Sequence, residues 1–93
     1  MNKPRQQDLA IQLEQKLTET YGPTMMNDDL CKVLGFRTMA AFRQALVRNQ
    51  VPVPVFSIRN RQGKFALTTD IAEWLAATRE QALVEKERKN ELK

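Results

Sequence analysis

The side chains best suited to chemistry in this sequence are seven cations, spread over forty consecutive positions that contain no Asp or Glu. Residues 30–69 carry Lys32, Arg37, Arg43, Arg48, Arg59, Arg61 and Lys64. The other residues carry eight basic and eleven acidic side chains, so the net charge changes from +7 in this segment to −3 outside it. A surface that binds a polyanion excludes carboxylates, because they would repel it. The pattern therefore indicates phosphate binding, and we expect double-stranded DNA as the partner.

Residues that most enzymes and metal sites require are missing. The chain has no His and one Cys, so it lacks the commonest general base and the commonest metal ligand, and it cannot form a thiolate cluster. The acidic pairs Asp28 with Asp29 and Asp70 with Glu73 fall at expected helix starts, where carboxylates favour the helix dipole. We predict that the protein is not an enzyme and uses no cofactor and no metal.

Length and composition predict one small domain with helical extensions. The 93 residues are 42% hydrophobic and 28% charged, which suits a single core. One Cys allows no internal disulfide, and no apolar run is long enough to span a bilayer or to act as a signal peptide. We expect a cytoplasmic protein with no membrane partner, located at the bacterial nucleoid if it binds DNA.

Three helices are predicted in the first half of the chain. Leu9, Leu13 and Leu17 recur every four residues and predict a helix over 4–20, which Gly22-Pro23 ends. A second helix is expected over 27–34, with Thr24 or Asn27 as its N-cap. A turn at Gly35 then leads to a helix over 39–49, capped by Thr38.

The helix over 39–49 has a buried side and a donor-rich side. Phe42, Ala45 and Leu46 form the buried side. The opposite side and the N-terminus of the helix carry the candidate DNA-binding residues Arg37, Thr38, Ala40, Arg43, Gln44 and Arg48. Arg and Gln have the bidentate geometry that reads guanine and adenine, so Arg43 and Gln44 are the first candidates for base contacts. Arg37, Thr38 and Arg48 are expected to contact phosphates at the two ends of the helix.

The region after this helix predicts an extended segment and a β-hairpin. Pro52 and Pro54 exclude helix. Strands are expected over 55–58 and 64–67 around a turn at 60–63, and the tip of this hairpin supplies a second set of DNA-binding candidates: Arg59, Asn60, Arg61 and Lys64. We interpret Phe42, Phe56, Phe65 and Trp74 as core residues and Cys31 as a small buried hydrophobe. A last helix begins at 68–70 and becomes strongly polar after Ala77.

These patterns resemble the excisionase-like and AlpA-like winged helix-turn-helix proteins, which are related to the DNA-binding domain of MerR regulators. The resemblance covers about residues 25–75. It lies in Asp29-Leu30-Cys31-Lys32-Val33-Leu34-Gly35-Phe36, in Thr38, in Val51-Pro52-Val53-Pro54-Val55-Phe56 and in Asp70-Ile71-Ala72-Glu73-Trp74-Leu75. It implies a small protein of a prophage, plasmid or other mobile element that regulates transcription or directs a recombinase.

The sequence thus predicts a mainly α protein with a small antiparallel β-hairpin, a winged helix-turn-helix. Its expected parts are an N-terminal helix (1–22), the DNA-binding domain (23–77) and a polar C-terminal helical extension or tail (78–93). The expected function is sequence-specific binding of double-stranded DNA as a transcription regulator. Because one short helix reads few base pairs, a homodimer or a cooperative homo-oligomer is expected on DNA, with the terminal helices as candidate contact surfaces.

Two alternatives stay open at this point. One is an excisionase, a recombination directionality factor that binds DNA beside an integrase site. Its partner is a recombinase, whereas a regulator acts on the transcription machinery. The other alternative is a protein-interaction adaptor that does not bind DNA, in which the basic segment meets an acidic protein.

Overall fold

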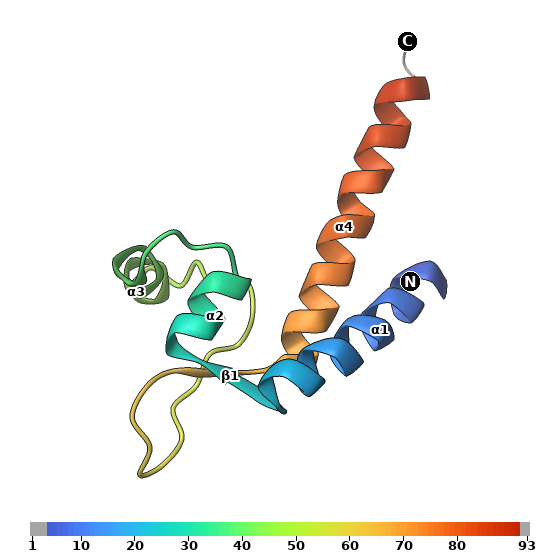
Figure 1. The fold of residues 1–93 in the computed structure, drawn as a ribbon. Helices are drawn as coiled ribbons and strands as arrows, with labels where there is room; N and C mark the ends of the chain where they lie inside the picture. The colour runs from blue at the N-terminus through green and yellow to red at the C-terminus, as the bar shows by residue number, and fades with distance from the viewer. Residues whose placement is uncertain (1–3, 92–93) are drawn as a thin grey trace.

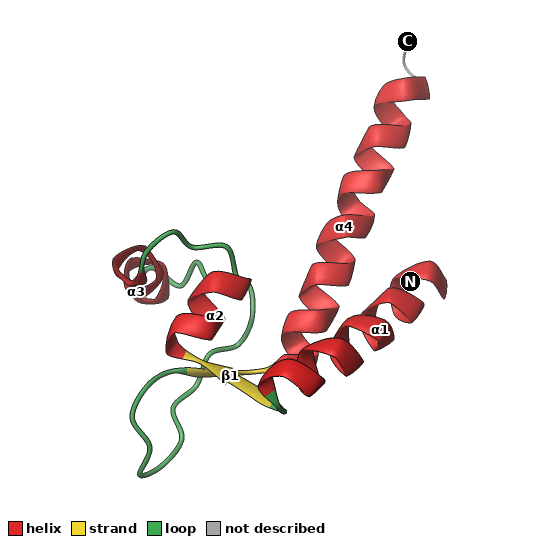
Figure 2. Cartoon of the chain, in the orientation of Figure 1, coloured by secondary structure: helices red, strands yellow, loops and turns green. Residues whose placement is uncertain are grey.

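The computed structural model describes residues 4–91, which form four helices and two short strands (Figure 1). The order along the chain is α1 (Pro4–Tyr21), β1 (Thr24–Met26), α2 (Asn27–Val33), α3 (Met39–Val47), β2 (Phe65–Leu67) and α4 (Thr68–Glu91). The expected mainly helical class with a small antiparallel sheet is confirmed (Figure 2).

Local signals place the first three helices close to their predicted bounds. Gly22 takes φ +86° directly after α1, and Gly35 takes φ +90° in the turn between α2 and α3. The Oγ1 of Thr38 accepts a hydrogen bond from the backbone N–H of Ala41 at 3.0 Å, so the predicted cap of α3 is confirmed. The predicted end of α3 is wrong by two residues. The helix ends at Val47, because Asn49 adopts the left-handed φ of +56° that ends a helical run.

The predicted N-cap of α2 is also wrong. Thr24 lies in β1, and the cap position is held by Met26, whose side chain makes no capping hydrogen bond. The side chain of Asn27 bonds elsewhere, to the backbone of Lys64. A strand leads directly into α2, so no loop residue is left in the position from which a side chain caps a helix.

Pairing of the strands differs from the predicted hairpin. β2 pairs with β1 in antiparallel register, with Thr24 opposite Leu67 and Met26 opposite Phe65. The expected strand over 55–58 contacts β2 only at an isolated bridge, where Phe56 and Phe65 exchange two backbone hydrogen bonds of 2.8 Å. After Phe56 the chain curls into a turn, in which the N–H of Arg61 donates to the carbonyl of Ile58 at 3.0 Å, so no further ladder forms.

A single hydrophobic core joins these elements. Its buried residues come from β1, α2, α3, the extended segment after α3, β2 and α4: Met25, Leu30, Cys31, Leu34, Phe42, Val53, Ala66 and Ile71. The prediction that Cys31 is buried is confirmed. Phe56 is a correction, because it lies partly exposed and stacks on Phe65 with ring centroids 6.4 Å apart. This core fixes α3 relative to the segment 51–55 and β2, between which the loop 57–64 lies.

Helices α1 and α4 lie against each other at one end of the two strands, and α2 and α3 lie toward the other end (Figure 1). α4 continues without a break from Thr68 to Glu91, and the molecule is 53 Å long as a result. The guanidinium of Arg5 on α1 donates hydrogen bonds of 2.6 to 2.9 Å to the carboxylate of Glu80 on α4. The hydroxyl of Thr69 donates to Glu14 at 2.9 Å and joins the same two helices nearer the sheet.

Candidate nucleic-acid interface

Helix α3 and the loop 57–64 face each other across a groove of about 680 Å³. Arg43 lines it from α3 and Lys64 from the loop. The other lining residues are Asn27, Asp28, Met39, Phe42, Leu46, Val47, Gln62 and Gly63. One member of each predicted set of DNA-binding residues therefore borders the same concave surface, although the two residues are 21 positions apart in the chain.

The outer face of α3 carries the predicted residues in one stripe. Ala40, Arg43, Gln44, Val47 and Arg48 line a shallow hollow on this face. They follow the three- and four-residue spacing that places side chains on one side of a helix. On the opposite side Phe42 and Ala45 are buried, which confirms the predicted inner face and leaves the donor side chains in solvent.

The loop is attached to the start of α2 by paired hydrogen bonds. The N–H of Asn27 donates to the carbonyl of Lys64 at 3.2 Å, and the N–H of Lys64 donates to Oδ1 of Asn27 at 3.3 Å. Gly63 lies against this contact with φ +104°, and a Cβ there would come within 2.6 Å of Oδ1 of Asn27. Gly63 is therefore needed both for its backbone conformation and for the space beside Asn27.

The seven cations of residues 30–69 are all exposed. Within the part of the chain that the structure describes, none of the seven forms a salt bridge, and the ion pairs there join Arg5 to Glu80 and to Glu87. The hydrogen bond that Arg5 donates to Glu80, followed by the negative charge of Glu80, raises the pKa of Arg5 above its usual value. Lys64 makes one side-chain contact, donating from Nζ to the hydroxyl of Ser57 at 3.3 Å. The central cations are available to an external anion.

Some predicted residues lie outside the groove. Arg37 is exposed in the turn before α3, and the hydroxyl of Thr38 is engaged as the helix cap. Arg59, Asn60 and Arg61 are exposed in the loop, beyond the residues that line the groove. They extend the basic surface away from α3.

Four residues that line the groove from outside α3 are absent from the predicted DNA-binding residues: Asn27, Asp28, Gln62 and Gly63. The first two precede the acid-free segment, and the fold brings them against the loop. Asp28 thereby adds a carboxylate to a surface that the sequence predicts to be free of acids. The sequence places Gly63 in the predicted turn over 60–63, but no pattern in the neighbouring residues predicts its contact with Asn27.

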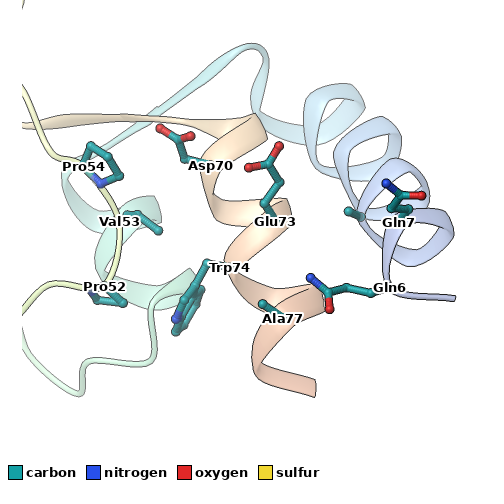
Figure 3. A pocket seen from close by; sticks show the side chains of 10 residues that line it. Gln6, Gln7, Pro52, Val53, Pro54, Asp70, Glu73, Trp74 and Ala77 are labelled. Atoms are coloured by element: carbon teal, nitrogen blue, oxygen red, sulfur yellow. The ribbon is translucent and has the colours of Figure 1, made fainter. Parts of the chain in front are cut away.

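A second cavity, of about 590 Å³, lies between α1, α4 and the segment 52–54 (Figure 3). The carboxylates of Asp70 and Glu73 lie beside each other at its edge, and Trp74 forms a wall opposite Pro52. Its lining residues include no Lys or Arg among those that the structure describes. A phosphate would be repelled there, so the groove beside α3 is the better candidate for an anionic ligand.

Two further findings bear on identity. No helix within residues 4–91 is both long and apolar enough to cross a membrane. Comparison of the chain with family models, with curated proteins and with solved structures gives no significant match.

Proposed function

We propose that the protein binds double-stranded DNA sequence-specifically as a winged helix-turn-helix, in which α2 and α3 are the two helices and the loop 57–64 is the wing. The observation that carries this proposal is the groove that both Arg43 of α3 and Lys64 of the loop line; the two belong to a set of seven exposed cations that form no salt bridge in the described part of the chain. A face of this kind is suited to a duplex, whose phosphates flank base edges.

In the proposed complex α3 enters the major groove, which is wide enough for one helix. Arg43 and Gln44 read base edges, because their side chains can make paired hydrogen bonds to guanine and adenine. Arg37 and Arg48 contact phosphates at the two ends of the helix. Arg59 and Arg61 in the wing grip the flanking backbone or the adjacent minor groove, where the negative potential favours Arg.

The biological role that we propose is regulation of transcription in a mobile element or prophage. Two or more copies would occupy neighbouring half-sites, since one helix specifies few base pairs. The family resemblance of residues 25–75 supports this role, and it supports the directionality-factor alternative equally. A circular-permutation assay separates the two: strong bending of DNA beside a recombinase site favours the directionality factor, whereas an unbent footprint over a promoter favours the regulator.

The test of DNA binding is a gel-shift titration of the full chain against its own upstream region and against unrelated DNA. Contacts to six or seven phosphates predict that affinity falls by about 10³ between about 50 and 200 mM salt. Absence of binding at the lower salt would refute the proposal and leave the adaptor. Equal binding to both DNAs would reduce the role to architectural binding without sequence preference.

A further inference from the structure

Val47 is the most solvent-exposed of the large hydrophobic side chains in the described part of the chain. It is 87% exposed, and the next, Ile11 on α1, is 54% exposed. Val47 occupies the last turn of α3 and lines both the hollow on the outer face of the helix and the groove toward the wing. It is therefore at the centre of the candidate interface and makes little contact with the core.

Stability of the helix does not account for a valine at this position. A β-branched residue has a lower helix propensity than Ala, Leu, Arg or Lys, and an exposed valine gains no packing energy in return. Single exposed hydrophobic residues are common on protein surfaces. This one, however, lines the hollow on the outer face of α3 with Arg43, Gln44 and Arg48, three long donors, and the lining of that hollow includes no Asp or Glu.

The edges of base pairs in the major groove offer hydrogen-bonding atoms and one apolar group, the C5 methyl of thymine. Arg and Gln match the hydrogen-bonding atoms, and an aliphatic side chain matches the methyl. We infer that Val47 determines specificity by packing its methyl groups against the C5 methyl of a thymine, next to the bases that Arg43 and Gln44 read. This inference rests on the proposed function, because it needs α3 to enter the major groove.

Replacement of thymine by deoxyuridine removes that methyl and leaves every hydrogen bond of the base pair in place. The probes are duplexes that the full-length wild-type chain enriches from a random-sequence pool, resynthesised with deoxyuridine at one thymine at a time. At the contacted thymine we expect wild-type affinity to fall about fourfold, which corresponds to about 0.8 kcal/mol for one buried methyl. The Val47→Ala variant should bind the two forms of the duplex equally.

Ile11→Ala is the matched control, because it truncates an exposed aliphatic side chain on α1 and should retain the wild-type response to deoxyuridine. Circular dichroism checks that each variant is folded. Failure of the wild-type chain to enrich any duplex would refute DNA binding and the inference together. If DNA is bound, the inference alone fails in three cases: no thymine is sensitive to loss of its methyl, Val47→Ala keeps the wild-type sensitivity, or the folded Val47→Ala protein loses all binding.

Discussion

The pair α1 and α4 uses charge in the opposite way to α2, α3 and the loop 57–64. On the side of α1 and α4, Arg5 is bound to Glu80, whose side chain is nearly buried, and the contact joins the two helices through residues that are 75 positions apart in the chain. On the side of α2, α3 and the loop, seven cations lie exposed and form no salt bridge in the described part of the chain. Both regions contain several Arg residues, but among the described residues only the first region has an Arg in a salt bridge with a carboxylate of the same chain.

This difference separates structural charge from charge directed to a partner. Arg5 helps to hold α1 against α4, and the carboxylates that pair with it, those of Glu80 and Glu87, come from α4. Exposed cations that form no salt bridge repel one another where they lie close together, and this repulsion does not stabilise the free chain. The proposed DNA complex removes the repulsion, because phosphates then neutralise the cations.

Replacement of Arg43 by Ala should have the largest effect on binding. Loss of a bidentate base contact is expected to weaken the best duplex by about 1–3 kcal/mol and to relax preference at particular base pairs. Competition gel shifts with single-base variants of the duplex measure both effects. Arg79→Ala on α4 removes the same charge from an exposed helix position and is the control. A comparable loss in Arg79→Ala would contradict the assignment of α3 as the reading helix.

Gly63→Ala tests whether the loop must be held against α2. We expect a loss of stability of about 1–2 kcal/mol, because the new Cβ would both strain the backbone and crowd Asn27. Thermal unfolding measures the loss, and amide exchange at Lys64 reports the contact. Gly22→Ala is the matched control, since Gly22 has a similar φ of +86° but no atom within 4 Å of its Cβ position. Equal losses in both variants would show that crowding at Asn27 is unimportant.

Lys64→Ala should weaken binding to all duplexes alike and reduce the log–log salt slope by about 1, since a Lys that contacts phosphate carries no sequence information. Salt titrations with a preferred and an unrelated duplex measure this. The substitution also breaks the hydrogen bond to Ser57, and Ser57→Ala removes that bond while keeping the charge. An unchanged slope in Lys64→Ala, or an equal change in Ser57→Ala, would exclude the phosphate contact.

Arg5→Ala should have the smallest effect on DNA binding and act on stability alone. Removal of the guanidinium takes away the bidentate partner of Glu80, so the melting temperature should fall while affinity for DNA stays at the wild-type value. Differential scanning fluorimetry measures the melting temperature, and gel shifts on the same preparation measure the affinity for DNA. If Arg5→Ala reduced the affinity for DNA and left the melting temperature unchanged, the assignment of Arg5 to stability alone would be wrong.

Much of the local structure follows from nearby residues. The spacing of Leu9, Leu13 and Leu17 identifies α1, because the helical period can be read along the chain without knowledge of contacts. Thr38 and Gly35 identify the turn and the start of α3 for the same reason, since caps and left-handed turns are interactions within a few residues. The outward face of α3, with Arg43 and Gln44, follows once the buried Phe42 and Ala45 are placed.

Pairing over long sequence distances was not predictable in the same way. Three residues of β1 are too few for a periodic signal, so the sequence predicts the neighbouring segment 55–58 as the partner of β2, whereas β2 pairs with β1. The contact of Asn27 with Lys64 joins residues 37 positions apart and has no local signature. The same is true of Arg5 with Glu80.

The amino-acid sequence alone determined the helices, their turns and the segregation of basic from acidic residues, because propensity, capping and charge are properties of neighbouring residues. The tertiary structure alone decided that Arg43 and Lys64 share a groove and that Asp28 joins it. These relations depend on the packing of α3 on α2 and on the hydrogen bonds between Asn27 and Lys64, which join residues that are distant in the chain.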